Sequence, residues 1–535
     1  MLLISHWAFS QTYSDHAALS RRLNAVASAN PQNTRLTSIA KTAGGKDIWL
    51  LEIGSGDRTT RPGIAVIGGV EGSHLLGTEL AVGFAEKLLA SANADSIKTL
   101  LASTTFYVFP NVSPDASEQY FAKLKYERSG NTTATDDDRD GKQNEDPFED
   151  LNNDGQITWI RIEDQTGKWK VHPADPRIMV MANAEKGEVG KYNLVSEGTD
   201  NDKDGKFNED GEGGIHFNKS LTFDPPYFTA GAGEHPVTEI ENRAVLDYLY
   251  DRFNVFAVVT FGPTNNLSEP WKFDKSKNSG RIPAGITESD AKQSKLASDL
   301  YKKAVTLKDA PAAGPQKGDV SQWAYFHYGR HSFSTPGWWA PKFEVPKDSA
   351  SAKKFKANED KNTDVDFVRW ADKEKVDVFM NWTKISHPDF PNMNAEVGGF
   401  KPFVKTNPPY SYVDKLAGEH TKFLISIAQK KPQIELLNLK TEALDGGVTR
   451  VTVTVQNSGL FPAVADIARN NNWIKLVKVS LVTDQAIIGG KKITLLPNLE
   501  AGESKTISWL VKGKGKVTIE AGAPQTGIKT LNASL

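Results

Sequence analysis

The chain contains no cysteine among its 535 residues. Disulfide crosslinks and thiolate metal sites are therefore excluded, and any metal ion must be held by histidine, aspartate, glutamate or backbone oxygens. The sequence also lacks an apolar run of about 18 residues, the length that indicates a membrane-spanning helix. The net charge of -2 argues against nucleic-acid binding, which usually requires a strongly basic surface.

The N-terminus carries a short apolar segment, MLLISHWAFSQTYS, with a small-x-small pattern at Ala8, Phe9 and Ser10. This pattern is typical of the cleavage site of a signal peptide, although no basic region precedes it. We interpret residues 1–12 as the remnant of a signal peptide whose start lies upstream; the alternative is a frayed apolar terminus. The interpretation predicts a secreted or periplasmic protein.

A glycine-rich loop follows a short apolar stretch in the first part of the chain. Residues 64–67 predict a buried strand and residues 77–92 predict a helix, so the loop between them should lie at the end of a parallel strand. Glu71 and His74 are three residues apart in this loop, a spacing at which a carboxylate and an imidazole can bind one metal ion. The alternative is a solvated glutamate and a histidine that packs against the helix.

The loop is similar to the metal-binding loop of the zinc carboxypeptidase family, the carboxypeptidase A/B-like metallopeptidases. Residues 77–79 (GTE) match the Gly-small-Glu that opens the family's helix. However, Glu71 stands where the family has its histidine ligand, and His74 stands where it has its glutamate ligand. The resemblance therefore implies a degenerate zinc site at which the first two ligands are exchanged.

A second segment, residues 214–219 (GIHFNK), resembles the family's Gly-Val-Asp-Leu-Asn-Arg, whose asparagine and arginine hold the terminal carboxylate of the substrate. The resemblance implies that Asn218, Lys219 and Arg128 contact a substrate. Lys219 would attract a carboxylate as a point charge, but it lacks the two-pronged grip of an arginine. His216 stands in place of the family's aspartate.

Two further positions depart from the family pattern. The predicted strand 255–261 should end in the third zinc ligand, a histidine, and Gly262 follows it instead. Residues 318–339 resemble the family's run toward its catalytic glutamate, where this chain has Pro336 and Gly337. No catalytic residue is therefore assigned.

Three acidic loops repeat the pattern Asp-x-Asp/Asn-x-Asp-Gly within an insertion at residues 136–212. Oxygen-bearing side chains at loop positions 1, 3 and 5, followed by glycine at position 6, are the arrangement that a calcium ion needs. These side chains are Asp136, Asp138 and Asp140; Asp150, Asn152 and Asp154; and Asp200, Asp202 and Asp204. None of the loops has a glutamate at position 12, although Glu145, Asp146, Glu209 and Asp210 could supply further oxygens. We expect calcium binding; the alternative is a solvated acidic insertion.

The last hundred residues have a different pattern. Residues 413–429 predict a helix, residues 430–432 (KKP) predict a linker, and several segments with period-2 alternation follow. Such strands at regular spacing predict an immunoglobulin-like β-sandwich over residues 433–535.

Together these patterns predict an α/β fold over residues 13–430, a metallocarboxypeptidase-like mixed sheet with helices on both faces, followed by the C-terminal sandwich. The predicted function is that of a secreted, catalytically inactive pseudo-peptidase that binds peptide or glycan ligands, with calcium as its expected cofactor. One alternative is an active metallocarboxypeptidase with rearranged zinc ligands, for example Glu71, His74 and His216. Another is a purely structural role. No nucleic-acid partner and no membrane span are expected.

Overall fold

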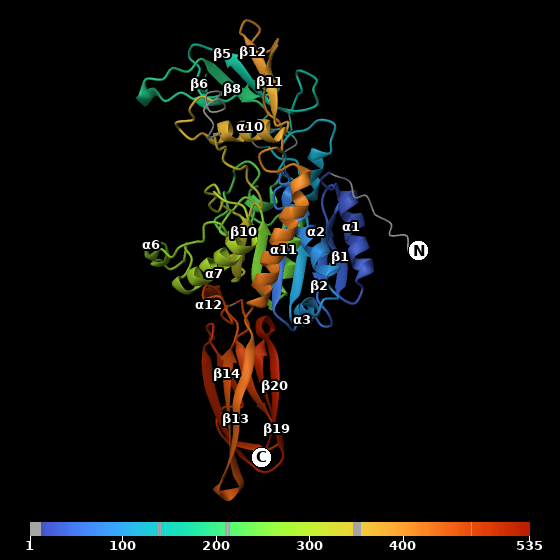
Figure 1. The fold of residues 1–535 in the computed structure, drawn as a ribbon, viewed down its shortest axis with the longest axis vertical. Coiled ribbons are helices and arrows are strands. Elements are labelled where there is room, and N and C mark those ends of the chain that lie inside the picture. Colours follow the sequence, from blue (N-terminus) through green and yellow to red (C-terminus); the bar gives the residue numbers. More distant parts are fainter. Residues whose placement is uncertain are drawn as a thin grey trace.

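The computed structural model describes residues 12–136, 139, 141–144, 146–208, 211, 214–345, 355–471 and 473–535. The molecule is elongated and has three parts (Figure 1): an α/β body in the middle, a smaller sheet at one end and a β-sandwich at the other. The residues that we interpret as a signal peptide lie outside the described residues, except Thr12.

The body is built on a six-stranded mixed sheet with the strand order β1-β2-β4-β3-β9-β10. Strands β4, β3, β9 and β10 run parallel, whereas β1 and β2 pair antiparallel with their neighbours at one edge. The bounds are β1 (Thr34–Lys41), β2 (Asp47–Ile53), β3 (Gly63–Ile67), β4 (Thr105–Phe109), β9 (Val255–Phe261) and β10 (His331–Thr335). The predicted mixed sheet is thus confirmed.

Helices cover both faces of this sheet because its strands are apolar on both sides. Ile64 and Val66 pack with α2, α7 and α11 in one core, and Ala65 and Ile67 pack with α5 and α8 in the other. The bounds of the helices are α1 (His16–Ala29), α2 (Leu75–Ala90), α3 (Asp95–Ser103), α4 (Pro114–Ser117), α5 (Ile240–Tyr250), α6 (Lys275–Asn278), α7 (Glu288–Ala304), α8 (Val320–Phe326) and α11 (Val413–Gln429). No helix in the described part of the chain combines the length and apolarity that a bilayer crossing requires.

A second six-stranded sheet, with the order β11-β12-β5-β8-β6-β7, forms the small end of the molecule. Its bounds are β5 (Trp159–Glu163), β6 (Trp169–Val171), β7 (Met179–Met181), β8 (Tyr192–Ser196), β11 (Phe379–Ile385) and β12 (Ala395–Phe400), with α10 (Thr363–Glu374) beside it. The sequence patterns did not predict this sheet, because its strands are short and mostly half-buried. Its small core consists mainly of Ile160, Ile162, Ala395 and Val397.

The C-terminal part is an all-antiparallel sandwich of two four-stranded sheets, ordered β13-β14-β18-β16 and β17-β15-β19-β20. Alternate residues of β14 and β15 face the core between the sheets, which confirms the predicted sandwich. The bounds are β13 (Ile434–Leu444), β14 (Val448–Asn457), β15 (Val477–Val482), β16 (Ala486–Gly489), β17 (Ile493–Leu496), β18 (Ser504–Lys512), β19 (Lys516–Ala523) and β20 (Gly527–Ser534), with α12 (Ala468–Asn471) facing the body.

Candidate functional site

The loop between β3 and α2 lies at the carboxyl end of the parallel strands, as predicted. The chain turns sharply there because a Cβ at Gly68 would lie 2.4 Å from the carbonyl oxygen of Gly77, and Gly69 adopts a positive φ of 58°. Only glycine tolerates such close backbone approach. The turn places Glu71 and His74 before the first turn of α2, and His74 is its N-cap residue.

His74 is bound to the backbone of Pro336, the residue that the sequence resemblance places where the family has its catalytic glutamate. Its Nε2 lies 2.9 Å from the carbonyl oxygen of Pro336, and a carbonyl can only accept a hydrogen bond, so Nε2 carries the proton. Burial lowers the pKa of His74 to about 4, so the imidazole is neutral at physiological pH. The interaction fixes the ring against the end of β10.

Glu71 is bound to Asn218, a residue that the family resemblance implies contacts a substrate. Asn218 Nδ2 donates to Glu71 Oε1 over 3.0 Å, and Asn218 Oδ1 accepts from the backbone N–H of Val320 over 2.9 Å. Burial raises the pKa of Glu71 to about 7, well above its ordinary value of 4.5. Asn218 therefore joins the β3–α2 loop to the first residue of α8.

Gly262, which the resemblance places at the third zinc ligand, lies against an apolar side chain. A Cβ at Gly262 would lie 2.6 Å from Val70 Cγ2, so a larger side chain would require Val70 to move. The position after Pro336 is equally restricted, because Gly337 has a φ of 76° and a Cβ there would lie 2.2 Å from Leu80 Cδ1. Neither position has room for a metal ligand or a general base.

The proposed set of rearranged ligands does not come together. Within the described residues, the ligand atoms of Glu71, His74 and His216 are not all within 4.8 Å of one another, the spacing that one ion would require. His216 instead contacts Gly231, whose carbonyl oxygen accepts a hydrogen bond from the His216 backbone at 2.7 Å. Burial lowers the pKa of the His216 imidazole to about 4.

The two cations expected to contact a substrate donate hydrogen bonds to backbone carbonyls of nearby loops. Lys219 Nζ donates to the carbonyl oxygen of Ala230. Arg128 is buried, and it donates to the carbonyl oxygens of Gly130, at 3.1 Å, and Asn131. Both side chains hold the walls of the site in place, and Lys219 remains partly exposed.

The three acidic loops share the same backbone features at those positions that the structure describes in all of them. Position 4 has a positive φ in each of them, at Arg139, Asn153 and Lys203, and so does the glycine at position 6. In each loop the position-1 carboxylate accepts a hydrogen bond from the backbone N–H of that glycine. The N–H of Gly141 donates to Asp136 at 3.1 Å, that of Gly155 to Asp150 at 2.7 Å, and that of Gly205 to Asp200 at 3.1 Å. Asp138 and Asp140 lie outside the described residues. The repetition indicates that the three loops are one structural motif used three times.

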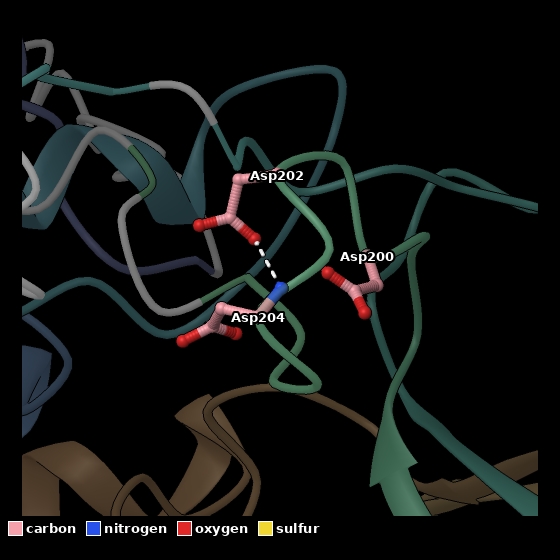
Figure 2. A group of neighbouring side chains, drawn as sticks. All are labelled: Asp200, Asp202 and Asp204. Atoms are coloured by element: carbon pink, nitrogen blue, oxygen red, sulfur yellow. Dashed lines mark hydrogen bonds between the residues drawn. The ribbon is translucent and has the colours of Figure 1, made fainter.

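In the third loop the carboxylates converge (Figure 2). One oxygen from each of Asp200, Asp202 and Asp204 lies within 4.8 Å of the others, and this is the only such group of three among the described residues. Asp202 Oδ1 accepts a hydrogen bond from the Asp204 backbone at 3.1 Å, and Lys206 Nζ lies 2.5 Å from Asp204 Oδ2. The third loop thus brings three carboxylates together, and Lys206 supplies one positive charge beside them.

The first and third loops pair through Asp146. This buried carboxylate accepts hydrogen bonds from the backbone N–H groups of Asn201, at 3.2 Å, and Asn208, at 2.6 Å. Asp146 therefore links the loops rather than pointing freely toward an ion. Glu145, Glu209 and Asp210, the other oxygens expected to complete the loops, lie outside the described residues.

Residues 19–335 match the family model described as zinc carboxypeptidase. The chain belongs to the zinc carboxypeptidase family. Residues 433–534, the β-sandwich, match a second model described as a domain of unknown function (DUF8731).

Individual relatives in the zinc carboxypeptidase family match only part of the body. The chain is 30% identical over 111 residues to carboxypeptidase E of Caenorhabditis elegans, and 28% identical over 132 residues to carboxypeptidase D of Mus musculus. These matches cover 20% and 24% of this chain, and 24% and 10% of the respective relatives, so the chain spans a quarter or less of either relative. Among solved structures, thrombin activatable fibrinolysis inhibitor is similar over 79% of this chain and 78% of its own, with 10% identity and a TM-score of 0.43.

Proposed function

We propose that this chain is a member of the zinc carboxypeptidase family that binds peptides without hydrolysing them. One observation carries the proposal: within the described residues, the ligand atoms of Glu71, His74 and His216 do not come close enough together to hold one ion. The packing of Gly262 against Val70 supports it, because the third zinc ligand has no counterpart there.

The residues of this site do not fit zinc, the typical cofactor of the family. A catalytic zinc ion needs three protein ligands and an open position, and the water it activates needs a base within hydrogen-bond reach. Here Glu71 Oε1 accepts from Asn218, and His74 donates from Nε2 to a carbonyl while its buried Nδ1 has no hydrogen-bond partner among the described residues. These two side chains lack a third ligand, because no further ligand atom converges with them within the described part of the chain. Pro336 and Gly337 have no side chain that could act as a base.

Peptide binding is the part of the family's activity that this chain can retain. The carboxypeptidase fold binds peptide substrates, and the partly exposed Lys219 still carries a positive charge where the family holds the terminal carboxylate. A ligand held there would lack the bidentate hydrogen bonds of an arginine, so we expect modest affinity.

The proposal is tested by measuring zinc content, peptide hydrolysis and peptide binding on the same purified protein. We expect no stoichiometric zinc after incubation with the metal, and no release of C-terminal amino acids from a mixed peptide library. His74→Ala removes a candidate ligand, and His235→Ala removes an exposed histidine as the control. The two variants should have the same zinc content. Peptides with a free C-terminus should be retained more strongly than amidated ones. Zinc-dependent hydrolysis that is lost in Glu71→Ala would show that the chain is an active metallocarboxypeptidase and would overturn this proposal. Failure to retain any peptide would overturn the binding role.

We also propose that the three acidic loops bind calcium. The support is their common backbone, with glycine at position 6 and the position-1 carboxylate bound to that glycine, together with the convergence of Asp200, Asp202 and Asp204. Calcium prefers six to eight oxygen ligands, so water or neighbouring loops must complete each site.

Finally, we propose that the protein is secreted or periplasmic, on the basis of the pattern at Ala8, Phe9 and Ser10. N-terminal sequencing of the protein from its native host should begin at Gln11 or a neighbouring residue. An intact Met1 on protein recovered from the cytoplasm would contradict this.

A further inference from the structure

A cavity of about 580 Å³ lies between the α/β body and the small sheet. Its walls come from the segment after β4, the second acidic loop, the segment after β10, α10 and the chain between β12 and α11. Glu71, His74 and Asn218 are not among its lining residues, so the cavity is separate from the degenerate zinc site. Its size lies within the range of about 300 to 1,000 Å³ typical of small-molecule sites.

One side of the cavity is a continuous set of aromatic rings. Tyr13 packs edge-on against Tyr410 at 5.3 Å and against Tyr120 at 5.8 Å, and Tyr120 packs against Phe403 at 5.2 Å between ring centroids. The Tyr13 hydroxyl donates to the carbonyl oxygen of Pro408 over 2.7 Å, which fixes this ring further. These contacts hold the rings rigidly. Tyr13 and Phe403 are buried, so the half-buried Tyr120 and Tyr410 present the accessible part of this apolar wall to a ligand.

A second aromatic pair, Trp338 and Trp370, also lines the cavity, with ring centroids 5.8 Å apart. Trp338 follows the end of β10 and Trp370 lies on α10, so this pair joins the body to the helix beside the small sheet. Both rings are buried, so they line the cavity at the junction of the two parts without offering it an exposed face.

Its charged lining residues are three lysines, Lys123, Lys125 and Lys401, and one aspartate, Asp154. Lys125 Nζ lies 5.1 Å from the centre of the Tyr120 ring, and Lys401 Nζ also contacts the exposed Asp377. Lys123 is exposed and has no ion-pair partner in the described part of the chain. The lining therefore has an excess of positive charge.

The acceptors that line the cavity are largely engaged within the protein. Asp154 Oδ1 accepts from the backbone of Gln156 at 2.9 Å, and Asp154 Oδ2 accepts from Asn152 Nδ2 at 2.8 Å. The amide oxygen of Asn407 accepts from the backbone N–H of Leu76 at 3.0 Å. The groups left for a ligand are mainly the lysine donors, and these favour a ligand rich in acceptors.

We propose that this cavity binds an acidic oligosaccharide, a chain of sugar rings that carry carboxylates. The carbon-bearing faces of the rings would pack against the aromatic wall, while carboxylate and hydroxyl oxygens accept hydrogen bonds from the lysines. A peptide without acidic side chains is less suited, because its C-terminus is the one carboxylate that it offers to the three lysines, whereas every ring of the acidic oligosaccharide carries one. The inference does not depend on the proposed peptide binding, since the two sites share none of the residues argued above.

The test is calorimetric titration of the full chain with uronic-acid trisaccharides, starting with trigalacturonate, and with the same sugars as methyl esters. The ester keeps the rings and removes the charge. We expect at least one uronate to bind and its ester to bind about tenfold more weakly or worse. The Lys123→Gln/Lys125→Gln variant should lose affinity by a similar factor. The Lys302→Gln/Lys303→Gln variant, with the same charge change on exposed lysines of α7, should bind like the wild type.

Tyr120→Leu tests the aromatic wall separately, and its melting temperature should first show that it is folded. It should weaken the binding of both the uronate and the ester. No binding of any uronate, equal affinity for uronate and ester, or no effect of the Lys123/Lys125 pair would overturn the proposal. Tighter binding of triglutamate than of every uronate would assign the cavity to an acidic peptide instead. Zinc-dependent peptide hydrolysis would refute the proposed function and leave this result unchanged.

Discussion

At the scale of single residues, the substitutions in the degenerate site fit one another except at His74 Nδ1, which is buried without a hydrogen-bond partner among the described residues. His74 requires an acceptor for its Nε2 proton, and the carbonyl of Pro336 provides it. Gly262 leaves the space that Val70 fills, and Gly337 leaves the space that Leu80 fills. A single reversion would leave a buried polar group unpaired or create a clash. We therefore expect that restoring one family residue would destabilise the protein before it restored any metal binding.

Glu71 should make the stability of the protein depend on pH. Its pKa is about 7 in the folded chain and near 4.5 when unfolded, so the folded state holds the proton more tightly. Stability is therefore highest below about pH 4.5 for this group and falls as the pH rises toward 7, by on the order of 2 kcal/mol given its partial exposure. Glu71→Gln, which keeps an acceptor for Asn218, should remove this component.

The measurement is urea unfolding of wild type and Glu71→Gln between pH 4.5 and 8. The difference between their unfolding free energies should grow as the pH rises and level off above about pH 7.5. Glu435→Gln, at a partly exposed carboxylate of the sandwich, serves as the control and should give a difference that does not follow this curve. A constant difference between wild type and Glu71→Gln would show that Glu71 titrates normally.

At the scale of elements, local sequence patterns predicted individual helices and strands, whereas the pairing of strands that are distant in the sequence could not be predicted. The expected strand 255–261 is β9 and the expected helix 413–429 is α11, because each carries its own apolar pattern and end signals. The small sheet was missed because β5 and β12 pair Ile162 with Ala395, far apart in the chain. For the same reason the sequence located the degenerate positions but could not show that His74 binds Pro336, 262 residues away.

The acidic loops should be stabilised by calcium. Their carboxylates repel one another when no cation is present, and an ion that binds only the folded loops stabilises them by about 2.7 kcal/mol at a hundredfold excess over its dissociation constant. The melting temperature should therefore rise on adding calcium and fall on adding a chelator. Asp200→Asn/Asp204→Asn should reduce the shift, because each asparagine keeps the size of the side chain but not its charge.

The control for this experiment is Asp247→Asn/Asp251→Asn, which removes two exposed carboxylates at α5. It should respond to calcium like the wild type. An equal calcium shift in both double variants, or no shift in the wild type, would show that the acidic loops are solvated turns.

At the scale of the whole molecule, the two additions to the body lie at opposite ends of its central sheet (Figure 1). The small sheet stands near the carboxyl ends of the parallel strands, where the cavity and the degenerate site are found. The sandwich packs at the other end, beside Val255 and His331, the first residues of β9 and β10. Ligands bound near the small sheet are therefore remote from the sandwich, which has its own contact with the body.

Asp290 of α7 is a buried part of that contact. This buried carboxylate accepts hydrogen bonds from the backbone N–H groups of Asp466, at 2.9 Å, and Ile467, at 3.0 Å, and from the Tyr325 hydroxyl at 2.8 Å. Asp290→Ala would leave these three donors without an acceptor at the interface, and each buried donor left unpaired costs about 1 to 3 kcal/mol. We expect the sandwich to separate from the body while both remain folded.

Calorimetry and limited proteolysis check this last prediction. Asp290→Ala should show two resolved thermal transitions and faster cleavage near residues 430–432, where the body ends and the sandwich begins. Asp299→Ala, which removes an exposed carboxylate of the same helix, should behave like the wild type. Because the interface lies at the opposite end of the sheet from the acidic loops, the calcium shift of the body should persist in Asp290→Ala. An unchanged single transition with wild-type protease resistance would mean that the remaining contacts of the interface hold the sandwich in place without Asp290.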